Sequence, residues 1–113
     1  GLAWQPLDGL PREAAAAQPD DAARLAPRAC HVHLKNYRMD AASGRLHLGA
    51  ALEEGALDWR RMLAALRAAG YDDALCLEFT RFDAAPLTER LAADLAFARE
   101  AWRAAAPDAE EPA

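Results

Sequence analysis

The clearest periodicity in the hydrophobic pattern is that of a helix over residues 58–69. Large apolar side chains recur there at intervals of three and four positions, at Trp59, Met62, Leu63 and Leu66. This spacing puts them on one face of a helix. Asp58 is a suitable N-cap residue and Gly70 a suitable C-terminal cap, so we expect the helix to begin and end there.

A second helix is predicted to start near Pro86, because the apolar residues that follow share one face: Leu87, Leu91, Leu95, Ala98 and Trp102. Near the start of the chain, residues 11–18 have a helix-forming composition but almost no large apolar side chain. We therefore expect them to pack weakly. Pro19 and the acids after it favour a new helical start, and this piece ends by Pro27.

Two segments alternate with the period of a β-strand. In residues 29–35, Val32 and Leu34 share one face, and the other face carries His31, His33 and Lys35. Residues 74–79 are predicted to form a second strand. Its faces carry Leu75, Leu77 and Phe79 on one side and Ala74, Cys76 and Glu78 on the other. Residues 1–11 are predicted to form a loop, and residues 36–57 a long irregular connection.

The predicted order is helix, strand, long loop, helix, strand, helix. Strands that alternate with helices indicate parallel β/α units with the helices packed outside the sheet. Two strands alone do not make a stable parallel sheet with both faces covered. We therefore expect residues 1–106 to be an incomplete unit that pairs with another chain or belongs to a larger barrel or sheet. Residues 107–113 form an acidic tail that is predicted to be disordered.

Charge and composition exclude some classes of partner. The net charge of −5 argues against nucleic acid, and no apolar run approaches the ~18 residues of a membrane span. Cys30 and Cys76 fall on opposite strand faces, so we expect two buried thiols rather than a disulfide. This usage favours a reducing compartment and a cytoplasmic location.

The row of ionisable side chains in residues 29–35 is the strongest indication of a site. Charge in a dry interior needs a metal, a counter-charge or a bound substrate. Lys35 is the only lysine beside twelve arginines, which favours a specific role for it. His33 and Glu78 lie near the ends of their strands, where parallel sheets build their sites.

Imidazole and carboxylate together suit a divalent ion such as Mn²⁺, Mg²⁺, Co²⁺ or Zn²⁺. Lys35 and Arg38 could hold an anionic or enediolate oxygen, and Trp4 could line a sugar pocket. His31 lies deeper and is assigned a supporting, hydrogen-bonding role. Two simpler interpretations remain open: His33 as a hydrogen-bonded core histidine, and Lys35–Glu78 as an ordinary ion pair.

Four segments resemble the sugar phosphate isomerase/epimerase family, the xylose isomerase-like TIM barrels: WQP, HVHLK, EEGALDW and AGYDDALCLEF. The resemblance spans residues 2–102 but covers only the last part of such a barrel. This part is the end of strand six, followed by strands seven and eight with their helices. It implies the C-terminal portion of a (β/α)8 fold, which typically needs ~250 residues.

The resemblance also implies roles for single residues. His33 falls on the metal-binding histidine of strand seven, and Glu78 on the strand-eight glutamate that binds metal and acts as acid/base. Lys35 matches the lysine of an H-x-K pattern, and Arg38 lies one residue short of a substrate-binding arginine. Asn36 stands where many members have Asp. In the family's G-E-G-x-x-D-W loop, Glu53 stands where a glycine is usual.

The implied function is metal-dependent isomerisation or epimerisation of a sugar or sugar phosphate, with proton transfer through a metal-stabilised enediolate. The expected partners are a small carbohydrate and the remaining barrel strands or another chain. The isolated chain is expected to have no strong isomerase activity. The alternatives are a non-catalytic binding module and another activity of the superfamily, such as a sugar-acid dehydratase or lyase. An endonuclease IV-like nuclease is disfavoured because it needs more histidines and a more basic face.

Overall fold

The fold was analysed in a computed structural model that describes residues 2–6, 11–78 and 87–105. The predicted tail and Phe79 lie outside these residues. The described elements, in chain order, are β1 (Leu2–Trp4), α1 (Arg12–Ala16), α2 (Gln18–Leu25), a 3₁₀ turn (Ala26–Arg28), β2 (Ala29–Leu34), β3 (Asn36–Met39), β4 (Leu46–Ala50), α3 (Trp59–Ala68), β5 (Ala74–Leu77) and α4 (Leu87–Ala104).

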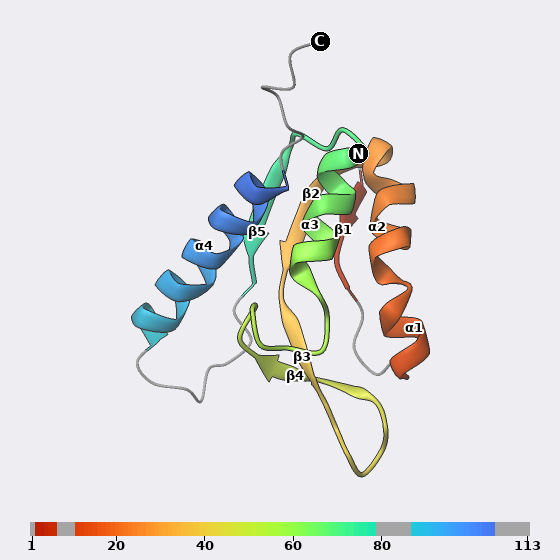
Figure 1. Ribbon diagram of the computed structural model, residues 1–113, viewed down its shortest axis with the longest axis vertical. Helices are drawn as coiled ribbons and strands as arrows, with labels where there is room; N and C mark the ends of the chain where they lie inside the picture. Colours follow the sequence, from red (N-terminus) through yellow and green to blue (C-terminus); the bar gives the residue numbers. More distant parts are fainter. Residues whose placement is uncertain (1, 7–10, 79–86, 106–113) are drawn as a thin grey trace.

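A parallel sheet of three strands in the order β1-β2-β5 organises the structure. It is open at both edges within the described residues and does not close into a barrel. Helices α2, α3 and α4 lie across one side of it (Figure 1). The predicted parallel β/α arrangement is therefore confirmed. The prediction of a loop over residues 1–11 was wrong at Leu2–Trp4, since this segment pairs with β2.

The core lies between this sheet and the helices. The predicted apolar face of α3 is confirmed, since Trp59, Met62, Leu63 and Leu66 are each at most 1% exposed. From β2, the side chains of Val32 and Leu34 are buried against them. Asp58 caps the helix as predicted, because its carboxylate accepts a hydrogen bond from the backbone N–H of Arg61.

The predicted apolar face of helix α4 is confirmed in part, since Ala98 is buried and Trp102 packs against the core. Phe97 and Ala101 are buried together with Ala98, whereas Leu95 is 39% exposed. The helix packs against α3, where the Arg60 guanidinium lies 4.9 Å from the centre of the Phe97 ring. Phe97 thus lies on the α3 side of the helix, and Leu95 lies on the side beside β5.

The prediction of an irregular connection over residues 36–57 was wrong, since β3 and β4 pair there as an antiparallel hairpin. Its tip projects beyond the carboxyl-terminal end of the parallel sheet (Figure 1). Gly44 provides the positive φ of 72° that the turn needs, and the Asp40 carboxylate accepts from the backbone N–H of Ser43. Apolar and polar residues alternate only over Tyr37-Arg38-Met39 and Leu46-His47-Leu48, so the sequence pattern is short and weak.

The cysteine prediction is confirmed in one respect and wrong in another. Cys30 and Cys76 are free thiols, but both are exposed. Cys76 lies opposite His33 in the register of β2 and β5. It therefore belongs to the sheet face that no helix of the described ranges covers. None of the helices in those ranges is long and apolar enough to cross a membrane.

Asn36 is the central polar residue of the core and is only 1% exposed. Its Nδ2 donates to the carbonyls of Leu52 and Leu57, and its Oδ1 accepts from the backbone N–H groups of Tyr37 and Leu57. The amide thus ties the start of β3 to the loop before α3. Gly55 passes so close that a Cβ at this position would overlap the Asn36 side chain.

We predict that Gly55→Ala destabilises the protein by about 3 kcal/mol, because the added methyl group overpacks the Asn36 network. In the Asn36→Ala background the overlap is absent, and the same change should cost less than ~1 kcal/mol. Urea unfolding of the four variants of this double-mutant cycle measures the coupling. Equal costs of Gly55→Ala in the two backgrounds would contradict the prediction.

A second prediction concerns the ion pair that joins α3 and α4. Arg60 donates to both carboxylate oxygens of Glu100, at 2.7 and 3.0 Å. These bonds hold the pKa of Glu100 below its ordinary value. The ion pair stabilises the folded state fully when the pH is above the pKa that Glu100 has in the unfolded chain. This stabilisation is lost as the pH falls through the lower pKa that Glu100 has in the folded state.

Glu100→Gln should therefore lower the urea midpoint at neutral pH, and the difference from the unsubstituted protein should shrink below about pH 4. Glu54→Gln removes one charge from an exposed loop position and serves as the control. A Glu100→Gln effect that is the same at all pH values would exclude this ion pair as its cause.

Candidate functional site

The carboxyl-terminal ends of β2 and β5 bring together three residues that the sequence singled out, His33, Lys35 and Glu78. The register pairs His33 with Cys76 and Leu34 with Leu77. The backbone N–H of Glu78 donates to the carbonyl of Leu34 at 3.0 Å and extends the ladder by one step. Because side chains alternate along strands, His33, Lys35 and Glu78 share the sheet face away from the helices.

Lys35 and His33 both approach the same oxygen of Glu78, Oε1. Lys35 Nζ lies 2.8 Å from it, and His33 Nδ1 lies 3.7 Å from it. The Lys35 side chain is only 10% exposed, compared with 40% for Glu78. Oε1 itself is almost completely shielded from solvent, although the rest of the carboxylate is more open. An ion pair of this partly exposed kind contributes up to about 1 kcal/mol of stability.

His33 has a second partner that sequence reasoning missed. Its Nδ1 lies 2.9 Å from Gln5 Oε1, and since an amide oxygen only accepts, this contact is a hydrogen bond when Nδ1 carries the proton. Gln5 directly follows β1, so the pairing of β1 with β2 positions it. The ring of His31 meets that of His33 edge-on at 4.9 Å. His31 therefore contacts its neighbour, and the supporting, hydrogen-bonding role assigned to it stays a prediction.

The backbone of Lys35 is also held. Trp59 Nε1 donates to the Lys35 carbonyl at 2.8 Å, and the next residue, Asn36, is fixed by its own amide network. Trp59 was predicted as a packing residue at the start of its helix, and that prediction is confirmed by its burial. The positioning hydrogen bond was not predicted. The only signals of this arrangement in the sequence were the adjacency of Lys35 and Asn36 and the Asp58-Trp59 pair at the start of the helix.

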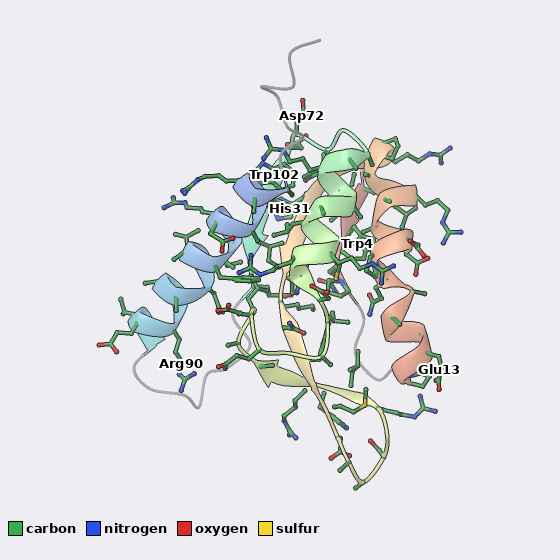
Figure 2. The ribbon with its side chains drawn as sticks, viewed as in Figure 1. Trp4, Glu13, His31, Asp72, Arg90 and Trp102 are labelled. Atoms are coloured by element: carbon green, nitrogen blue, oxygen red, sulfur yellow. The ribbon has the colours of Figure 1, made fainter. Side chains whose placement is uncertain are left out.

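The other predicted site residues lie apart from this cluster. Trp4 pairs with Val32 in the sheet register, so its side chain faces the helices and packs against the core (Figure 2). Arg38 is exposed on β3 opposite His47. The substrate-binding roles predicted for Trp4 and Arg38 stay predictions, and the arrangement brings neither of them to Glu78.

The donor set was tested as a metal centre. His33 Nδ1 and Glu78 Oε1 face each other, and imidazole and carboxylate are suitable ligands for a divalent ion. Within the described ranges, however, no group of three or more His, Cys, Asp or Glu side chains is arranged to hold a metal ion. These residues fit part of a metal centre and do not complete one.

A parallel β/α fold with ionisable side chains at the carboxyl ends of its strands belongs to the class of proteins that build sites on the rim of a sheet or barrel. A family model for the xylose isomerase-like TIM barrel matches residues 6–110. The chain therefore belongs to the xylose isomerase-like TIM barrel family, as its sequence motifs predicted. Searches of the curated proteins and of the solved structures gave no match.

The network beside the cluster can be tested with Asn36→Asp. A carboxylate there would face the carbonyls of Leu52 and Leu57 without a donor and would place an unpaired charge in the core. We expect a loss of about 3 kcal/mol or more at neutral pH, measured by urea unfolding. Ala42→Asp, which adds one negative charge at an exposed turn position, is the control. Equal effects of the two substitutions would mean that the Asn36 donors are dispensable.

Proposed function

We propose that this chain supplies the strand-seven and strand-eight side of the active site of a metal-dependent sugar or sugar phosphate isomerase or epimerase. The observation that carries the proposal is that His33 and Lys35 both approach Oε1 of Glu78 at the carboxyl end of the sheet. Family membership alone supports the fold, whereas this cluster supports the chemistry.

In this proposal, Glu78 transfers the proton. Its carboxylate is accessible at the rim, so it can accept a proton from the carbon beside a ketose or aldose carbonyl and later release it. Lys35 holds the carboxylate in place through Oε1.

His33 and Glu78 are the residues that would hold a divalent ion. When bound, such an ion supplies positive charge that stabilises an enediolate. Further ligands and a second acid/base carboxylate would come from strands that complete the barrel. The uncovered sheet face supports this, because His31, His33 and Cys76 stand on a surface that other strands of a barrel would enclose. For the same reason, we propose that the 113 residues alone turn over no ketose at a substantial rate.

The test is metal analysis of the longest natural form of the protein, with His33→Ala and Glu78→Ala compared with the unsubstituted protein. We expect each substitution to lower the bound metal and to reduce ketose turnover by at least about a hundredfold, as for loss of an acid/base group. Glu13→Ala, at an exposed position of α1 outside the cluster, is a matched control. Unchanged metal content in both cluster variants would refute the proposal and favour the non-catalytic binding module.

A further inference from the structure

Within the described ranges, each of the two open edges of the parallel sheet carries a groove beside the helix that covers it. At one edge, β5 and α4 form a groove of about 580 Å³ that is lined mainly by apolar side chains, among them Leu75, Leu77 and Trp102. At the other edge, β1 and α2 form a groove of about 470 Å³ that includes Ala3 and Leu25. Figure 1 shows α4 beside β5 and α2 beside β1, on opposite sides of the sheet. Both edges therefore present apolar surface next to a strand.

The exposed leucines lie at the same two edges. Among the described residues, two large apolar side chains are exposed: Leu95, which lines the β5–α4 groove, and Leu2 of β1, which is 47% exposed. A single exposed leucine is ordinary on a protein surface. Here, however, each leucine accompanies a strand that has a described neighbour on one side only. The backbone N–H and C=O groups of such an edge favour pairing with another chain.

The two edges also differ in charge. Arg99 and Arg103 line the β5–α4 groove, whose described lining includes no acidic side chain. Glu100, which lies between them in the sequence, is engaged by α3. At the other edge, Asp21 lines the β1–α2 groove, where its pair with Arg24 is exposed to solvent. The acids of α2 outnumber its bases, so an acidic edge and a basic edge lie on opposite sides of one sheet.

We infer that these edges bind each other, so that the β5–α4 edge of one copy of this chain docks against the β1–α2 edge of a second copy. In this head-to-tail contact β5 runs parallel to the β1 strand of the neighbour, and the helices of both copies lie on the same side. Apolar surface meets apolar surface, and the Arg99 and Arg103 edge meets the Asp21 edge. The alternative two-fold contact, between two β5–α4 edges, brings the arginines of both copies together, and repulsion between like charges disfavours it.

A head-to-tail contact has two consequences. Each copy uses a different edge on each side, so the copies form a ring or an open chain, depending on the rotation between neighbours. Because all strands run in one direction, the clusters of His33, Lys35 and Glu78 from neighbouring copies lie on one rim. The contact itself is independent of the proposed function, since it needs neither a metal ion nor a substrate.

Sedimentation velocity of the 113-residue chain from micromolar to millimolar concentration tests the contact. We expect an average mass above that of the monomer that rises with concentration. Leu95→Glu and Leu2→Glu each place a charge at one edge, and each should raise the dissociation constant at least about tenfold. Ala42→Glu adds the same charge at an exposed turn of the hairpin and should leave the association unchanged.

Mixing the two edge variants is the decisive measurement. Leu95→Glu keeps an intact β1–α2 edge and Leu2→Glu keeps an intact β5–α4 edge, so an equimolar mixture should form a dimer with one copy of each and no larger species. Circular dichroism verifies that each variant is folded. Arg99→Glu impairs the same edge as Leu95→Glu and should also form a dimer with Leu2→Glu, so it replaces Leu95→Glu if that variant does not fold.

Formation of this mixed dimer supports the head-to-tail contact, because destabilised variants do not restore each other. A chain that stays monomeric at every concentration would refute the inference, and so would a mixture that forms no dimer. If Leu95→Glu dissociates while Leu2→Glu still associates, two β5–α4 edges bind each other and the head-to-tail contact is wrong. If Ala42→Glu weakens association as strongly as the edge variants, the association does not depend on the edges.

Discussion

The alternation of side chains along β2 is the constraint on which the rest of the structure depends. Val32 and Leu34 must be buried under the helices, and the two-residue period then places His31, His33 and Lys35 on the opposite face. A shift of one residue would bury three ionisable groups and expose two aliphatic ones. The same burial that stabilises the core therefore decides which residues can form a site.

Parallel pairing turns this local constraint into a cluster. β5 pairs with β2 so that Glu78 follows its strand beside Lys35, and both then lie at the rim. The helix side holds this arrangement in place, because Trp59 bonds the Lys35 carbonyl and Asn36 bonds the loop before α3. Buried polar groups with every hydrogen bond made are rigid. The position of the charged cluster thus depends on a neutral network on the other side of the strand.

The sequence was sufficient to predict the parts of this fold that depend on the periodicity of hydrophobic residues within one segment. It was not sufficient where contacts between distant segments determine the structure. The α3 face and the meeting of His33 with Glu78 follow from spacing and strand order. The β3–β4 hairpin needs pairing across a turn, and its weak alternation concealed it. Gln5 could not be predicted as the partner of His33, since β1 is three residues long and only its register with β2 brings Gln5 there. Leu95 was predicted on the apolar face of α4 but is exposed, and Phe97 is buried instead where α4 packs against α3, a contact that the periodicity of α4 alone does not reveal.

Charge balance limits what can complete the cluster. Lys35 and Glu78 together carry no net charge, and a neutral His33 adds none. A divalent ion would give the cluster a charge of +2, which is costly on a surface enclosed by other strands because desolvation weakens the screening of charge. In the proposed metal-dependent enzyme, strands that close the barrel over this face would then have to contribute carboxylates of roughly equal and opposite charge. A covering surface without such carboxylates would leave the Lys35–Glu78 pair as the lower-energy arrangement. Under the proposed function, the chemistry of this rim would therefore be decided jointly by Lys35 and by acids on the completing strands.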